Sequence, residues 1–147
     1  MTDQLVQPQV QQTASHFIEL TATRVSTSKI AVAGAGADTL QRGSGQHRFD
    51  FELIDQTGAG VRFKQVNNGM LDACDNSTSC PPPTGINSTQ IIAVTRQSDT
   101  RAGFTDKNDN SQLDMPVSYA LNFECNDPGV TEPIQFDPII INGGTNK

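Results

Sequence analysis

The chain has 147 residues, a formal net charge of −6 at pH 7 and a sequence pI of about 4.6. Its length fits one domain that can bury a core without metals or disulfides. The acidic charge argues against a nucleic-acid partner, because phosphates would be repelled. No apolar run approaches the ~20 residues that cross a bilayer, so we expect no membrane-spanning segment and no membrane partner.

The first fifteen residues are polar and rich in Gln, and no Lys or Arg appears before Arg24. A secretory signal needs a positively charged start followed by about 7–15 apolar residues. We therefore predict a loosely attached arm over residues 1–15, a single domain over residues 16–147 and a cytoplasmic location.

Apolar and polar residues alternate repeatedly along the chain, while helical periodicity is nearly absent. Alternation places successive side chains on opposite faces of a strand. The segments that predict strands are 16–25, 29–35, 48–55, 61–66, 88–97, 117–125 and 133–143, the last broken at Asp137-Pro138. Roughly seven to nine short strands separated by turns predict an all-β fold, a two-sheet antiparallel β-sandwich that is immunoglobulin-like in outline.

Two of these predictions are more detailed. Segments 48–55 and 61–66 flank a glycine-containing turn, which predicts a β-hairpin. Segment 117–125 alternates regularly, which predicts a half-buried strand with Tyr119, Phe123 and Cys125 on its inner face. The predicted core is made of large apolar residues that face inward in their strands: Leu20, Phe49, Phe51, Leu53, Phe63, Ile91 or Ile92, Val94, Tyr119, Leu121, Phe123, Phe136, and Ile139 or its neighbours.

Residues 67–90 form the longest segment that we assign to a loop, and this loop contains Cys74, Cys80 and three consecutive prolines. Cys125 brings the cysteine count to an odd number. Without a secretory signal, that count favours reduced thiols, although a Cys74–Cys80 bridge stays open for an exported protein.

Two segments resemble cofactor-binding motifs but lack features that those motifs require. A zinc site would have to be completed by His16 and His47, and the cysteines lack the close paired spacing that zinc sites use. The stretch around Gly34 and Gly36 imitates a dinucleotide-binding turn, but Thr39 stands at the third glycine position and no crossover helix can follow. We therefore expect no cofactor at either place.

The loop over residues 106–114 spaces oxygen-bearing side chains at every second position, a pattern found around calcium. The candidate metal ligands are Asp106, Asn108, Asn110 and Asp114. Ser111 stands where calcium loops carry glycine, so any affinity should fall in the weak ~10⁻⁴–10⁻³ M range. The alternative, which we favour, is a turn whose Asp and Asn side chains cap their own backbone amides.

Catalytic motifs are absent from the sequence. Asp50 and Glu52 share one face of a predicted strand, so a carboxylate-dependent hydrolase is the alternative enzyme. Solvated charges on an outer strand face are commoner and protect a sheet from edge aggregation. We expect a protein that is not an enzyme and has no catalytic residue.

The stretch Gln135–Gly144, together with Phe104–Asn108 and the strand around Tyr119, resembles a loose group of small bacterial proteins. These proteins, named DP-EP proteins, end in an aromatic-D-P-x-I-x-N pattern, here from Phe136 to Asn142. The resemblance covers roughly the last 45 residues. It implies a cytosolic β-sandwich with no assigned activity, and it supplies no site residue.

These observations favour a non-enzymatic binding or structural module that acts through an edge strand or through its long loop. The alternatives are a weak calcium-dependent binding module that uses residues 106–114, and the hydrolase. Residues 139–141 are all Ile, so both faces of that strand need cover. We therefore predict a protein partner or a second copy of the chain, with a homodimer as the default.

Overall fold

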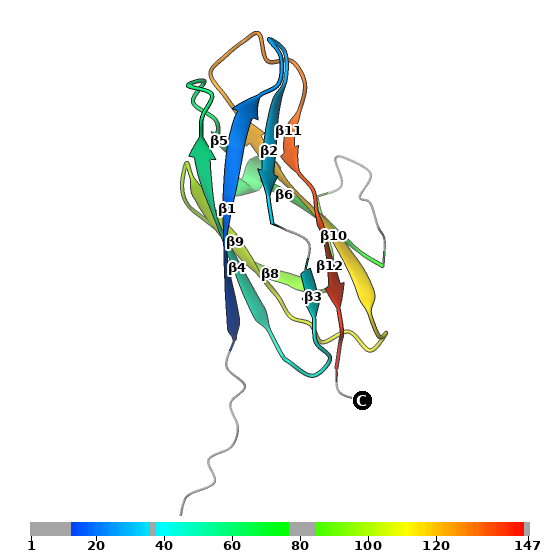
Figure 1. The fold of residues 1–147 in the computed structure, drawn as a ribbon. Coiled ribbons are helices and arrows are strands. Elements are labelled where there is room, and N and C mark those ends of the chain that lie inside the picture. The colour runs from blue at the N-terminus through cyan, green and yellow to red at the C-terminus, as the bar shows by residue number, and fades with distance from the viewer. Residues whose placement is uncertain (1–12, 36–37, 77–84, 146–147) are drawn as a thin grey trace, which may run out of the picture.

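The computed structural model describes residues 13–35, 38–76 and 85–145. Two β-sheets pack face to face, and these residues contain no α-helix (Figure 1). The predicted all-β, two-sheet sandwich is confirmed. Twelve strands lie within the described ranges, more than the seven to nine predicted. Strands of two or three residues are too short to show alternation, and two longer missed strands, residues 71–75 and 101–106, consist mostly of buried residues.

The first sheet has the strand order β2-β1-β4-β9-β8. Its strands are β1 (Ala14–Arg24), β2 (Ile30–Gly34), β4 (His47–Asp55), β8 (Ile91–Ser98) and β9 (Arg101–Asp106). The second sheet has the order β3-β12-β10-β6-β7, and β5 and β11 also pair with β10. Its strands are β3 (Asp38–Leu40), β5 (Arg62–Phe63), β6 (Leu71–Asp75), β7 (Ile86–Asn87), β10 (Met115–Glu124), β11 (Ile134–Phe136) and β12 (Ile139–Asn142).

Both sheets are mixed, where the sequence predicted antiparallel sheets. β1 runs parallel to β4, β3 to β12, and β6 to β7, while the other pairs are antiparallel. Between β2 and β4 the chain crosses to the second sheet and forms β3 there. It then returns beside β1 in the same direction, which no local alternation could reveal.

Aromatic side chains fill the space between the sheets. Phe51 and Phe104 from the first sheet face Tyr119 from the second, with ring centroids 6.1 Å apart for Phe51–Tyr119 and 5.0 Å for Phe104–Tyr119. The predicted core is buried at nearly every position. Ile91 is the buried member of its pair and Ile92 is exposed, and Ile140 rather than Ile139 is fully buried. Val94 is half-buried and packs against the core.

The predicted hairpin between segments 48–55 and 61–66 is wrong. β5 is two residues long and pairs with β10 in the other sheet. The turn after β4 is organised by the Asp55 carboxylate, which accepts hydrogen bonds from the backbone N–H and hydroxyl of Thr57 and from the N–H of Val61. These bonds, acting against desolvation, lower the pKa of Asp55. The hydrogen bonds to Asp55 hold a turn after which the chain leaves the first sheet.

β10 is buried along nearly its whole length rather than half-buried as predicted, and it is the central strand of its sheet. Its polar residue Asn122 is buried and donates to Asp72 Oδ2 at 2.9 Å and to the Gly69 carbonyl at 2.8 Å. Cys125 lies just beyond the strand, half-buried against the core. The polar face of this strand is therefore satisfied within the protein.

The segment 67–90 contains more structure than the predicted loop. A 3₁₀ turn (Val66–Asn68) leads into β6, which pairs along five residues with β10. β7 then pairs with β6. β6 escaped prediction because Leu71, Asp72 and Ala73 are all buried and give no alternation. The prolines at 81–83 lie outside the described residues.

Cys74 in β6 is disulfide-bonded, and Cys125 is a free thiol. The expectation of reduced thiols throughout is therefore wrong. The remaining cysteine, Cys80, lies outside the described residues. A stable disulfide is typical of oxidising compartments.

The chain's N-terminal region is described from Thr13 onward. β1 begins at Ala14, so the last residues of the predicted arm belong to the sheet, while residues 1–12 lie outside the described part. Gly34 of the apparent dinucleotide motif ends β2, and β3 follows, while Gly36 lies outside the described residues. In the described part of the chain, no helix has the length and apolar character needed to cross a membrane.

Replacing Phe123 by Ala tests the core. Phe123 is 2% exposed and packs on Phe63 with ring centroids 4.7 Å apart. Its truncation leaves a cavity and should lower the free energy of unfolding by about 3–5 kcal/mol in urea denaturation. Phe17→Ala is the control, because Phe17 is 57% exposed. A loss of under about 1 kcal/mol for Phe123→Ala would contradict the described packing.

Candidate functional site

Three segments meet at one end of the sandwich, which we call the loop end. They are residues 41–46 before β4, residues 107–114 after β9, and residues 143–145 after β12 (Figure 1). The pairing of His47 with Asp106 brings the first two together, and the pairing of β12 with β3 adds the third. A pocket of about 580 Å³ opens here, to which Gln46, Lys107 and Asp109 contribute side chains.

Close backbone packing at this end depends on two glycines. A Cβ on Gly143 would lie 2.4 Å from the backbone nitrogen of Arg42. A Cβ on Gly144, whose φ is +91°, would lie 2.4 Å from the carbonyl oxygen of Asn110. Neither position has room for a side chain, so the C-terminal segment fits directly between the two loops.

Asn108 is buried at the junction of all three segments. Its amide nitrogen donates to the Gln41 carbonyl at 3.0 Å and to Ser44 Oγ at 3.1 Å. Its Oδ1 accepts the backbone N–H of Gly144 at 2.9 Å. The backbone at Asn108 has a positive φ of 51°, which Asn tolerates. This side chain acts as a brace between the loops.

Behind Asn108 lies a buried cluster of polar side chains. Asp106 Oδ1 accepts the backbone N–H of Asn108 at 2.9 Å and the side-chain amide of Asn142 at 2.7 Å. The side-chain amide of Asn110 donates to the carbonyl of Asn142 at 3.3 Å. Gln90 Oε1 accepts the N–H of Asp109 at 3.0 Å. The cluster joins β9 of one sheet to β12 of the other.

Three oxygens in this cluster accept no hydrogen bond from any described residue: Asp106 Oδ2, Asn110 Oδ1 and Asn142 Oδ1. The side chains that carry them are 0%, 7% and 0% exposed, respectively. Leaving a buried acceptor unpaired costs about 1–3 kcal/mol, and more for a charged group. Three of them in one cluster are unusual for a folded protein.

The predicted metal ligands are only partly brought together. Asp106 and Asn110 have unpaired oxygens in the buried cluster, whereas Asn108 uses its amide to brace the loops. Asp114 is exposed. Asn142 was missed, because nothing near it in the sequence indicates that β12 packs beside this loop. Among the described residues, no group of three or more His, Cys, Asp or Glu side chains is placed to hold a metal.

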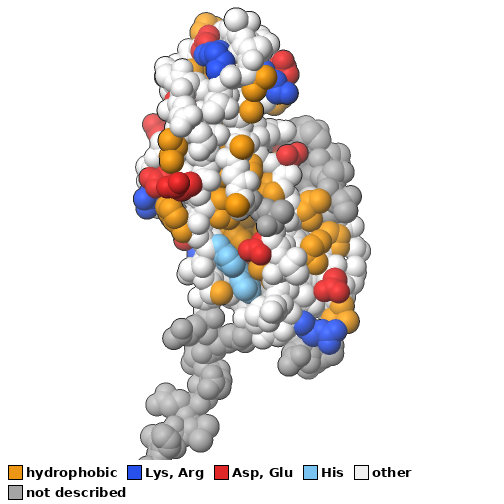
Figure 2. All heavy atoms as spheres, in the orientation of Figure 1, with side chains coloured by type: hydrophobic (Ala, Val, Ile, Leu, Met, Phe, Trp, Pro, Cys, Tyr) orange, Lys and Arg blue, Asp and Glu red, His pale blue; other side chains and the backbone are white. Residues whose placement is uncertain are grey.

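The two histidines lie side by side next to this end, and they form one patch in Figure 2. His16 Nε2 and His47 Nδ1 are 2.9 Å apart, and His16 Nδ1 lies 3.4 Å from Asp38 Oδ2. His47 Nε2 is 2.8 Å from Ser44 Oγ. The imidazole of His16 also stacks on Phe49, with planes 9° apart. Nothing in the sequence indicates that these residues form a hydrogen-bonded chain.

The hydrogen-bond partners assign the protons along this chain. The Ser44 hydroxyl donates to the Gln41 carbonyl at 2.6 Å and so accepts from His47 Nε2. His47 Nδ1 then carries no proton and accepts from His16. Burial, and next the charge of His16, lower the pKa of His47, in agreement with a neutral ring. His47 is therefore a donor to Ser44 and not a base that activates it.

The two carboxylates that we considered for hydrolysis, Asp50 and Glu52, each form an ion pair with an arginine. Asp50 lies 3.2 Å from the guanidinium of Arg48, and Glu52 lies 3.2 Å from that of Arg101. Both pairs lie on the outer face of the first sheet. This arrangement is typical of solvated surface charges.

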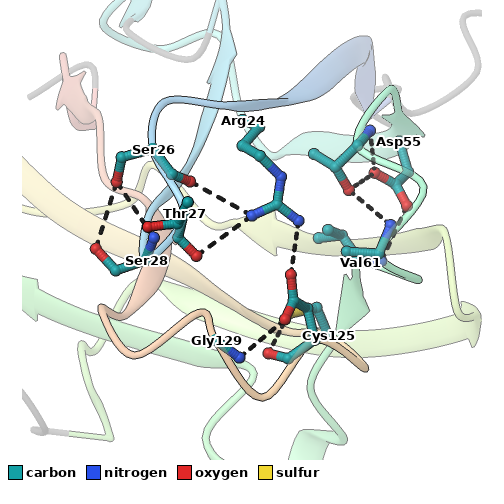
Figure 3. A network of polar contacts seen from close by, with 11 residues as sticks. Arg24, Ser26, Thr27, Ser28, Asp55, Val61, Cys125 and Gly129 are labelled. Carbon is teal, nitrogen blue, oxygen red and sulfur yellow. Dashed lines mark hydrogen bonds and ion pairs between the residues drawn. The ribbon is translucent and has the colours of Figure 1, made fainter.

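A second polar network lies at the opposite end of the sandwich (Figure 3). Arg24 donates to Asp127 Oδ2 at 2.8 Å and to the carbonyls of Ser26 and Thr27 at 3.4 and 3.5 Å. The N–H of Gly129, and next Arg24, lower the pKa of Asp127. Because Arg24 is shared among these acceptors, the network fastens the β1–β2 turn to the loop after β10.

No family model, curated protein or solved structure matches this chain. The resemblance to DP-EP proteins therefore stays a prediction, and the function is inferred from the site itself.

Asp106 makes a testable contribution to the pH dependence of stability. Burial, with smaller contributions from Asp75 and Asp109, raises its pKa from 3.8 to about 6. Between these values the folded chain binds more protons than the unfolded chain, so the free energy of unfolding falls as pH rises. In metal-free buffer, Asp106→Asn should remove a fall of about 3 kcal/mol that is spread over roughly pH 3 to 7.

Denaturant unfolding at several pH values measures this difference. Asp114→Asn is the matched control, because Asp114 is exposed in the same loop and should keep the wild-type slope. Other titrating groups cancel in the comparison. Equal slopes for the wild type and Asp106→Asn would contradict the burial of this carboxyl.

Proposed function

We propose that the protein is a non-enzymatic binding module whose binding surface is the pocket at the loop end. The observation that carries this proposal is the pocket of about 580 Å³, a size typical of sites for small ligands. Loops that are fixed by a rigid β-scaffold are common positions for binding residues.

The chemistry of the pocket favours a small, uncharged polar ligand. Thr13, Gln46 and Thr145 offer hydroxyl and amide groups along its wall. Lys107 and Asp109, also in the wall, lie 3.9 Å apart and balance each other's charge. A ligand rich in hydroxyl or amide groups can bond to these side chains without bringing a charge of its own.

The proton order around Ser44 supports binding rather than catalysis. A serine nucleophile needs a base that takes its proton, whereas here the hydroxyl donates to the Gln41 carbonyl. The carboxylates Asp50 and Glu52 are paired with arginines on another face. The hydrolase alternative gains no support from these contacts.

The site of action and the assembly are also proposals. The disulfide at Cys74 favours an oxidising compartment over the predicted cytoplasm. A second copy of the chain remains the proposed protein partner. Among the described strands, none covers the outer edge of β1 before Leu20, so this edge is a place for strand pairing between copies.

A ligand screen with matched variants tests the binding surface. Melting temperatures are measured with mono- and oligosaccharides, amides and short uncharged peptides, since a ligand that binds the folded state raises its stability. Gln46→Trp fills the pocket with a bulky ring. Gln56→Trp makes the same change at an exposed position of the opposite end.

We expect at least one ligand to raise the melting temperature of the wild type and of Gln56→Trp but not of Gln46→Trp. A ligand that stabilises Gln46→Trp equally binds elsewhere and contradicts the proposed surface. A screen in which no uncharged polar ligand shifts the wild type contradicts the proposed ligand class.

A further inference from the structure

The unpaired oxygens of Asp106, Asn110 and Asn142 come from two regions of the chain, one around residues 106–110 and the other at residue 142. Asp106 ends β9, Asn110 lies in the loop that follows, and Asn142 ends β12. The side chains of Asp106 and Asn142 are hydrogen-bonded to each other, and Asn110 is bonded to the backbone of Asn142. The three groups are therefore neighbours inside the protein.

The orientation of each amide is fixed by its own nitrogen. Asn142 Nδ2 faces two acceptors, Asp106 Oδ1 at 2.7 Å and Gln90 Oε1 at 3.4 Å. Asn110 Nδ2 faces the carbonyls of Gln112 and Asn142. Rotating either amide by half a turn would place oxygen against oxygen. The unpaired atoms are therefore oxygens, and their positions follow from these bonds.

The surrounding structure holds these oxygens in place independently of any ligand. Asp106 Oδ1 is fixed by the N–H of Asn108, and Asn108 is itself bonded to Gly144. Gly144 has no room for a side chain because Asn110 fills that space. A site built this way is rigid before a ligand arrives, which favours affinity.

The donor chemistry points to one class of ligand. One carboxylate and two amide oxygens, with no nitrogen or sulfur donor among them, match the ligands that hard cations prefer. Calcium accepts such mixed oxygen sets in flexible geometry, whereas magnesium requires near-ideal octahedral geometry and retains several waters. Three protein oxygens supply only part of the roughly 6–8 ligands that calcium takes, so backbone carbonyls or waters would complete its coordination.

We propose that Asp106, Asn110 and Asn142 bind a calcium ion in the interior of the loop end. This donor set differs from the one that the loop sequence suggests: Asn142 replaces Asp114, and Asn108 positions the loop without contacting the ion. The ion links β9 of one sheet to β12 of the other. The site stands independently of the proposed pocket ligand.

Such a site shapes the pocket that lies in front of it. Asn108, Asp109 and Gly144 line the pocket: Asn108 is hydrogen-bonded to Asp106, Asp109 precedes Asn110 in the chain, and Gly144 is hydrogen-bonded to Asn108. Bound calcium therefore stabilises further a pocket wall that the chain already holds in place, without contacting a ligand there. The single carboxylate places the dissociation constant toward ~10⁻⁴–10⁻³ M, the range of extracellular modules.

The test uses the full chain after treatment with EDTA and removal of the chelator. Calcium is titrated to 10 mM by calorimetry and by melting temperature, with magnesium and sodium at matched ionic strength as comparisons. Asp106→Asn removes the carboxylate while keeping its shape. Asp114→Asn makes the same change at the exposed end of the same loop.

We expect calcium to raise the melting temperature of the wild type and of Asp114→Asn, and magnesium and sodium to have no such effect. Asp106→Asn should weaken calcium binding at least tenfold. No response to calcium in the wild type overturns the site. An undiminished response in Asp106→Asn, or a loss in Asp114→Asn, overturns the donor set. An equal response to sodium overturns the choice of calcium.

Backbone amide NMR keeps the test decisive if Asp106→Asn does not fold. Calcium should shift the amide signals of residues 106–110 and 142–144 in the wild type. Shifts confined to the outer face around Asp50 and Glu52 would show surface binding and overturn the proposal.

Discussion

A buried hydrogen bond from the amide of Asn142 to the carboxylate of Asp106 joins the two sheets at the loop end. Strands on opposite sheets of a sandwich usually meet through apolar side chains, as Phe104 and Tyr119 do in this core. Here a polar contact continues that interface to the edge of the molecule. It brings β12 against the loop after β9, and both the pocket and the unpaired oxygens follow from that approach.

The two ends of the sandwich differ in how far their carboxylate and amide oxygens are hydrogen-bonded within the chain. At the Arg24 end, each carboxylate oxygen that is drawn into the network meets an N–H group or a guanidinium, so the charges are compensated within the chain. At the Asp106 end, acceptors outnumber donors, and burial raises the pKa of the carboxyl to about 6. A bound cation can compensate for an excess of buried acceptors. Without a cation, the chain would have to supply further hydrogen-bond donors.

Strands whose apolar and polar residues alternate could be predicted from the sequence, and strands without this alternation could not. β1 and β4 alternate and were found. Most residues of β6 and β9 are buried, so these strands show no alternation, and β3 and β7 are too short to have any. The residues of the candidate site also differ in how far the sequence could predict them. Asp106 and Asn110 belong to one recognisable loop, whereas Asn142 joins them only through pairing of β12 with β10 and β3.

The parallel pairing of β3 with β12 has a consequence for the order of folding. Its partners, such as Asp38 and Ile140, are about a hundred residues apart in the chain, so closing this contact carries a large loop entropy. Contacts of such long range form late, after local hairpins such as β1–β2. A partly folded chain can then hold its aromatic core while Asn142 is still far from Asp106. We therefore expect the loop end to assemble last, so that its oxygens come together only in the complete fold.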